Sequence, residues 1–130
     1  LTQAGTLPTP LILERNDMAS FEELLTATEV ILSQGNQQLI LCDSGIRTLN
    51  NANLPSLDLT SLIQIKATSH LPILINPSYA VSDDALLVQT QGIKQLKVDG
   101  LILNCPLDSH DDHESLNLIS AVVRELYRAN

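Results

Sequence analysis

Four short, continuous apolar runs constrain this chain more than any other feature, because they recur with helical segments between them. The runs read Leu-Ile-Leu at 11–13, Leu-Ile-Leu-Cys at 39–42, Ile-Leu-Ile at 73–75 and Leu-Ile-Leu at 101–103. Apolar residues that do not alternate with polar ones are typical of strands covered on both faces, as in parallel sheets.

The segments between these runs carry apolar residues at three- and four-residue steps, which predicts helices. Ser20 followed by Glu23 forms a capping box, and Gly35 with Asn36 ends the first helix. Further helices are predicted over about 59–68, from Ser82 onward and over 114–127. The order βαβαβαβα predicts an α/β fold with parallel strands and right-handed crossovers.

The length of the chain creates a packing problem. A closed (β/α)₈ barrel takes about 250 residues, and this chain has 130. Four βα units equal half a barrel, with two bare strand edges and an uncovered concave face that favour pairing with another chain. The alternative is a small open α/β domain that covers itself with its tail. We expect a single domain over 11–130, preceded by an N-terminal extension at 1–10.

Composition disfavours several classes of function. The formal net charge of −8 opposes binding to nucleic acid or to an anionic membrane surface. No apolar run approaches the roughly 20 residues of a membrane-spanning helix, and we expect no secretion leader. Cys42 and Cys105 form neither a disulfide framework nor a spaced zinc motif. We therefore expect a cytoplasmic protein that binds neither nucleic acid nor membranes.

Six stretches of the chain share their order and spacing with one enzyme family. They are Leu-Glu-Arg-Asn at 13–16, Ile-Leu-Ser-Gln-Gly-Asn at 31–36, Ile-Leu-Cys-Asp-Ser-Gly-Ile-Arg-Thr at 40–48, Leu-Asp-Leu at 57–59, Ser-His-Leu-Pro-Ile-Leu-Ile-Asn-Pro-Ser-Tyr-Ala at 69–80 and Val-Asp-Gly-Leu-Ile at 98–102. Together they resemble the DAHP synthase family, in its type Iβ branch. The resemblance implies the C-terminal half of a (β/α)₈ enzyme that condenses phosphoenolpyruvate with erythrose 4-phosphate.

The resemblance fails at the residues that bind substrate and metal in the family. It implies that Glu14 replaces a lysine that contacts phosphoenolpyruvate and that Ser44 replaces an arginine that holds the substrate phosphate. It also implies that Tyr79 replaces a metal-binding histidine, Asn76 the aspartate before it, and Asn104 a metal-binding glutamate. The family's metal-binding cysteine belongs to the half that this chain does not match, and its last aspartate ligand falls in the region of Asp108, Asp111 and Asp112. The family's metal would be a divalent ion such as Mn²⁺.

Electrostatics predicts what these replacements do. A phosphate needs cations or clustered N–H donors, and a carboxylate at position 14 repels it. Each lost charge interaction is on the order of several kcal/mol at an effective dielectric constant of about 20. Tyrosine and asparagine are poor ligands for a divalent metal at neutral pH. We therefore expect no catalytic residues, no metal and no cofactor.

One segment after the last apolar run is dense in possible metal ligands. These weak metal candidates are Asp108, His110, Asp111, Asp112 and His113. The alternative interpretation is a solvated acidic loop that caps the last helix, because three ligands are rarely so close together in sequence.

A remodelled pocket at the strand ends is a second candidate, because ligand sites gather there in parallel α/β folds. The candidate ligand-binding residues are Arg15, Arg47, Ser78, Tyr79 and Asn104. The two arginines suit a small anion, but they equally suit ion pairs with neighbouring carboxylates such as Asp43, Asp58 or Glu14.

The leading hypothesis is a catalytically inactive relative of DAHP synthase, kept as a half-barrel interaction, scaffold or regulatory module. Two copies would pair about a two-fold axis as a homodimer, and a full-length synthase or another enzyme of aromatic amino-acid (shikimate) biosynthesis is a further candidate partner. The second hypothesis is the C-terminal part of a longer, synthase-like transferase, which the initial Leu1 in place of Met would fit. The third is a small-molecule sensor.

Overall fold

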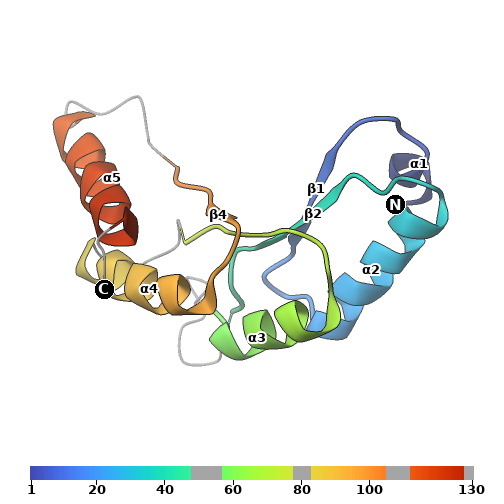
Figure 1. Cartoon of the computed structure of the whole chain (residues 1–130), viewed down its shortest axis with the longest axis horizontal. Helices are drawn as coiled ribbons and strands as arrows, with labels where there is room; N and C mark the ends of the chain where they lie inside the picture. Colours follow the sequence, from blue (N-terminus) through green and yellow to red (C-terminus); the bar gives the residue numbers. More distant parts are fainter. Residues whose placement is uncertain (48–56, 78–82, 105–111, 128–130) are drawn as a thin grey trace.

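The computed structural model describes residues 1–47, 57–77, 83–104 and 112–127, and its centre is a four-stranded parallel sheet (Figure 1). The strands are β1 (Leu11–Arg15), β2 (Leu39–Asp43), β3 (Ile73–Ile75) and β4 (Gly100–Leu101), and they lie side by side in chain order. The helices are α1 (Thr2–Gly5), α2 (Phe21–Ser33), α3 (Leu59–Thr68), α4 (Asp83–Leu96) and α5 (Asp112–Tyr127). The predicted α/β class, with strands and helices alternating, is confirmed.

Several predicted boundaries agree closely with the observed ones. Helix α3 covers the predicted residues, and α5 begins two residues before its predicted start at Glu114. The last strand ends earlier than its apolar run, at Leu101, but the backbone N–H of Ile102 still donates to Ile75 O at 2.8 Å. Because β4 has one described neighbour, only that side of it carries ladder hydrogen bonds.

Helix α2 begins as the sequence predicts. The Ser20 hydroxyl accepts from the backbone N–H of Glu23 at 3.2 Å, and the Glu23 carboxylate accepts from the backbone N–H of Ser20 at 2.7 Å. This reciprocal capping box satisfies two backbone donors that the first turn of a helix leaves unpaired. The chain turns out of the helix at Gly35, whose φ of +102° is a left-handed conformation that favours glycine.

The hydrophobic core lies between the sheet and helices α2, α3 and α4. Its strand members come from alternate positions, which all face the helices. The core residues are Leu24, Ile31, Leu39, Leu41, Leu62, Ile65, Leu71, Ile73, Ile75 and Ile93, with Leu11, Leu13 and Leu101 packed half-buried against them. In Figure 1 these helices form an arc along one side of the strands.

The opposite face of the sheet carries the intervening residues. Ile12 pairs in register with Ile40, and Cys42 with Leu74. Ile12 is 55% exposed and Ile40 and Leu74 are half-buried, whereas Cys42 is 1% exposed. The sheet therefore has one face buried under helices and an opposite face that is exposed at Ile12 and buried at Cys42.

The first ten residues contain a short helix that the sequence analysis did not predict. Helix α1 packs against α2, close to the C-terminal end of α2. A Cβ atom at Gly5 would lie 2.7 Å from Gln34 Cβ and 2.7 Å from Ile31 O, so only glycine permits this approach. Among the described helices, none is both long enough and apolar enough to span a membrane.

Candidate functional site

Three polar side chains meet at the C-terminal ends of β1, β2 and β3. The Ser44 hydroxyl donates a hydrogen bond to Glu14 Oε1, and the Asn76 side-chain amide donates to the same oxygen at 3.4 Å. Glu14 lies on β1, whereas Ser44 and Asn76 directly follow β2 and β3. In a parallel sheet the carboxyl ends of neighbouring strands share one edge, which is why residues so distant in sequence meet here.

A hollow of about 340 Å³ opens beside this cluster. It is lined by Glu14, Arg15, Asn16, Asp17 and Ser44. Two of these five residues are carboxylates, and the single guanidinium among them is occupied by other acidic groups. The hollow is therefore polar and suited to neutral or cationic groups rather than to a phosphate.

Arg15 is buried beneath the strand ends in an ion-pair network. Its Nε lies 2.7 Å from Asp43 Oδ1, and its Nη1 lies 3.9 Å from Asp58 Oδ2. The side chains of Arg15 and Asp43 are each 1% exposed. The geometry therefore supports the interpretation of Arg15 as an ion-pair partner over that of an anion-binding residue.

The two carboxyl groups of this network shift in opposite directions. Burial raises the pKa of Asp43 above its usual value, although the charge and hydrogen bond of Arg15 act to lower it. Burial also raises the pKa of Asp58, but hydrogen bonds from Ser61 together with the charge of Arg15 outweigh it, so the net shift is downward. Asp58 is the N-cap residue of α3, where an ionised carboxylate favours the helix start.

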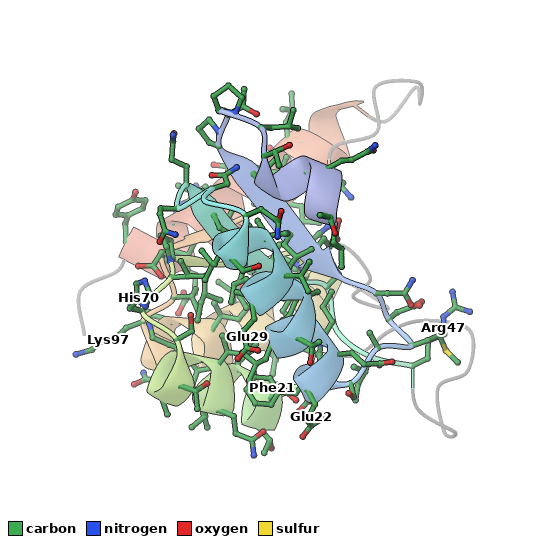
Figure 2. The ribbon with its side chains drawn as sticks, turned by 90° about the vertical axis from the view of Figure 1, so that its right-hand side faces the viewer. Phe21, Glu22, Glu29, Arg47, His70 and Lys97 are labelled. Carbon is green, nitrogen blue, oxygen red and sulfur yellow. The ribbon has the colours of Figure 1, made fainter. Side chains whose placement is uncertain are left out.

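Arg47 is held at the surface. Its Nε lies 2.5 Å from Asp17 Oδ2, and its backbone N–H donates to Asp17 O at 3.0 Å. Asp17 is a partner that the sequence analysis missed, although its place two residues after β1 puts it beside the loop that follows β2. Figure 2 shows Arg47 at one end of the molecule and Lys97 and His70 at the opposite end.

Cys42 lies next to Glu14 in the sheet register but has an unreactive environment. The residue is 1% exposed. Burial, with the negative charges of Glu14 and Asp43 added, raises the pKa of the Cys42 thiol to about 11. A buried thiol with a raised pKa is a weak nucleophile at neutral pH.

Of the two family metal positions that the resemblance places at Tyr79 and Asn104, the structure describes Asn104 alone. Within residues 1–47, 57–77, 83–104 and 112–127, no three His, Cys, Asp or Glu side chains gather in a way that would hold a metal ion. Asn104 lies exposed just after β4 and offers a neutral amide oxygen in place of a carboxylate.

Several predicted site residues lie outside the described part of the chain. These are Ser78, Tyr79, Asp108, His110 and Asp111. Asp112 and His113 occupy the first two positions of α5, and their side chains are not described.

Comparison with known proteins agrees with the motif resemblance. The family model described as the DAHP synthetase I family matches residues 1–115. A phospho-2-dehydro-3-deoxyheptonate aldolase from Thermotoga maritima is 41% identical over 80 residues, which are 62% of this chain and 24% of that protein.

Solved structures from the same organism match nearly the whole chain. A truncated form of 3-deoxy-D-arabino-heptulosonate 7-phosphate synthase superposes with a TM-score of 0.80 at 30% identity, covering 96% of this chain and 50% of that one. A phospho-2-dehydro-3-deoxyheptonate aldolase (DAHP synthase) structure gives the same score and identity and is covered over 39% of its length. The chain thus spans half or less of these relatives, and its four βα units correspond to half of a (β/α)₈ barrel.

Proposed function

Because this chain belongs to the DAHP synthetase I family, we propose that it is a half-barrel interaction module whose own strand ends no longer bind phosphoenolpyruvate. The role is structural or regulatory, exercised through contacts with another protein of aromatic amino-acid biosynthesis or with a second copy of itself. Two features support this role: strand ends that do not bind phosphoenolpyruvate, called here the silent site, and an apolar interaction surface.

The hydrogen bond from Ser44 to Glu14 carries the first of these, the silent site. By the family resemblance these positions hold an arginine and a lysine, both of which face the substrate phosphate. Here the two replacements bind each other, and Asn76, which stands in place of an aspartate, joins them. A carboxylate fixed in this place repels a phosphate, and the two arginines that the structure describes nearby, Arg15 and Arg47, are each paired with carboxylates.

The exposure of Ile12 on the outer strand β1 supports the interaction surface. Ile12 is 55% exposed, although an isoleucine on a sheet is normally covered. An apolar sheet face with unpaired strand edges beside it is the kind of surface that other chains cover.

The test is a synthase assay on the purified chain with phosphoenolpyruvate, erythrose 4-phosphate and Mn²⁺. We expect no consumption of phosphoenolpyruvate above the rate in buffer and no heat of binding in a phosphoenolpyruvate titration. Turnover by this chain would overturn the proposal. The titration separates a chain that binds substrate without reacting from one that does not bind at all, and binding alone would already refute the silent site.

A second candidate is the enzymatic one, in which the chain works as the C-terminal portion of a synthase. Its support is the coverage of half or less of the related structures. The same assay, repeated after adding the first four βα units of a family synthase as a separate chain, distinguishes the two. Activity that appears only in the mixture would favour the enzymatic candidate.

A further inference from the structure

Both outer strands of the sheet lack a neighbour on one side. Within the described residues, β1 pairs with β2 alone and β4 with β3 alone. All pairings are parallel, so each free edge presents backbone groups that a further parallel strand would satisfy.

The β1 edge is also less covered than the strand beside it. Leu39 and Leu41 of β2 are 2% and 1% exposed, because helices α2 and α3 flank them. Their register partners Leu11 and Leu13 of β1 are only half-buried, although they point to the same side of the sheet. In a repeating βα architecture each strand packs against its own helix and the helix before it. Among the described helices, the one before β1 is α1, which packs against α2 instead.

The β4 edge has an apolar groove beside it. A groove of about 390 Å³ runs between β4 and the helices α4 and α5. Its apolar lining comes from Ile93, Val98, Leu101, Leu103, Val123 and Leu126. Val123 of α5 remains 42% exposed and Tyr127, which also lines the groove, 86% exposed. Within the described residues, no strand covers this apolar face of α5.

We propose that a second copy of this chain fills that groove, with its β1 paired in parallel to β4 and its Leu11 and Leu13 packed against α5. The inference deepens the proposed interaction role by naming the surface and the partner. Each copy has one β1 edge and one β4 edge, so a two-fold axis along the centre of the barrel forms the same seam twice.

The dimensions of the fold favour a second copy as the occupant. The four βα units superpose on half of a solved synthase chain with a TM-score of 0.80, so they span half of a closed ring of strands. A half-turn therefore carries β4 of one copy to β1 of the other and closes the sheet without free edges. The same rotation brings the opposite faces of the two sheets toward one another, each with an exposed Ile12 and a half-buried Ile40.

The experiment measures mass in solution by sedimentation velocity, at protomer concentrations from about 1 to about 100 µM. The test variant is Val123→Glu, which places a charge in the groove. The matched control is Val88→Glu on α4, where Val88 is 67% exposed and does not line the groove. We expect a dimer for the wild type and for Val88→Glu, and a dissociation constant at least about tenfold higher for Val123→Glu.

A second variant protects the test against misfolding. Tyr127→Glu changes a groove residue that is 86% exposed, so the fold of the single chain does not depend on it, and its effect should match that of Val123→Glu. A wild-type chain that stays monomeric would overturn the proposal. So would a dimer that Val88→Glu weakens as much as Val123→Glu, or a monomer that binds the first four βα units of a family synthase instead. The synthase assay on the same samples tests separately whether the chain consumes phosphoenolpyruvate.

Discussion

Arg15 and Asp43 form a buried ion pair across the ends of β1 and β2, with Arg15 Nε 2.7 Å from Asp43 Oδ1. Arg15 Nη2 and Asp43 Oδ2 are buried without a hydrogen-bond partner in the described part of the chain. Two charges removed from water stabilise a fold only through each other, so the loss of one leaves the other buried and uncompensated. The pair therefore links the ends of β1 and β2. It also leaves the Arg15 guanidinium unavailable for binding an anion at the site.

Removing either partner should be strongly destabilising. We expect Arg15→Met and Asp43→Leu each to lower the free energy of unfolding by about 3 to 5 kcal/mol, and the double variant to lose less than the sum of the two. Urea denaturation followed by circular dichroism measures all three. Arg47→Met is the control, because Arg47 is 48% exposed in its pair with Asp17 and should change stability by less than about 1 kcal/mol. Equal effects at Arg15 and Arg47 would contradict the buried-pair argument.

The lowered pKa of Asp58 predicts a pH dependence with a defined sign. Burial raises this pKa, but hydrogen bonds from Ser61 and the charge of Arg15 bring it below its usual value. A carboxyl group with a depressed folded-state pKa contributes stability that is fully present above the unfolded-state pKa of about 3.9. That contribution is lost as the pH falls through the folded-state value.

Asp58→Asn isolates this charge, because asparagine caps a helix about as well as aspartate. We expect the free energy of unfolding of the wild type to exceed that of the variant by about 1 kcal/mol at neutral pH, with the difference lost as the pH falls below about 4. The charge of Asp58 also raises the pKa of Asp43, so the measured difference includes a smaller response from Asp43. Urea midpoints across this range measure it, and a difference that grows on acidification would reverse the assigned sign.

Two glycines in helices should respond to alanine in opposite directions. At Gly5 a Cβ would lie 2.7 Å from both Gln34 Cβ and Ile31 O, so Gly5→Ala should displace α1 and cost about 1 to 3 kcal/mol. At Gly92 the nearest atom, Leu59 Cδ1, is 3.6 Å away, which is an ordinary contact. Gly92→Ala in the interior of α4 should stabilise the chain by about 0.5 to 1 kcal/mol. Thermal denaturation of the two variants tests the pair, and a stabilising Gly5→Ala would show that α1 does not dock as described.

Sequence reasoning located the strands and helices because apolar runs and capping residues are local signals. The capping box at Ser20 and Glu23 is an example, since all of its hydrogen bonds join residues three positions apart. Helix α1 escaped prediction because it is four residues long and depends on a close approach to α2 at Gly5.

The candidate site was predictable in its residues but not in its contacts. The motif resemblance singled out Glu14, Ser44 and Asn76 one by one, and only the shared edge of a parallel sheet brings them onto one carboxylate oxygen. Arg47 was open to anion binding or ion pairing, and its partner Asp17 lies 30 positions away, joined by tertiary folding alone. Long-range pairing of this kind leaves no periodic trace in a sequence.

Restoring the charges should restore phosphate binding. In the double variant Glu14→Lys with Ser44→Arg, the hydrogen-bonded pair becomes two cations at the positions where the family resemblance places them. A hydrogen bond to a charged group contributes about 1.5 to 3 kcal/mol, so each new cation should tighten binding of phosphoenolpyruvate at least about tenfold. Isothermal titration with phosphoenolpyruvate measures the gain in affinity.

The control Glu14→Gln with Ser44→Ala removes the negative charge without adding a cation, so it separates relief of repulsion from new attraction. Wild-type binding as tight as that of the double variant would show that the Glu14 carboxylate does not face the ligand, and the silent site would lose its electrostatic basis.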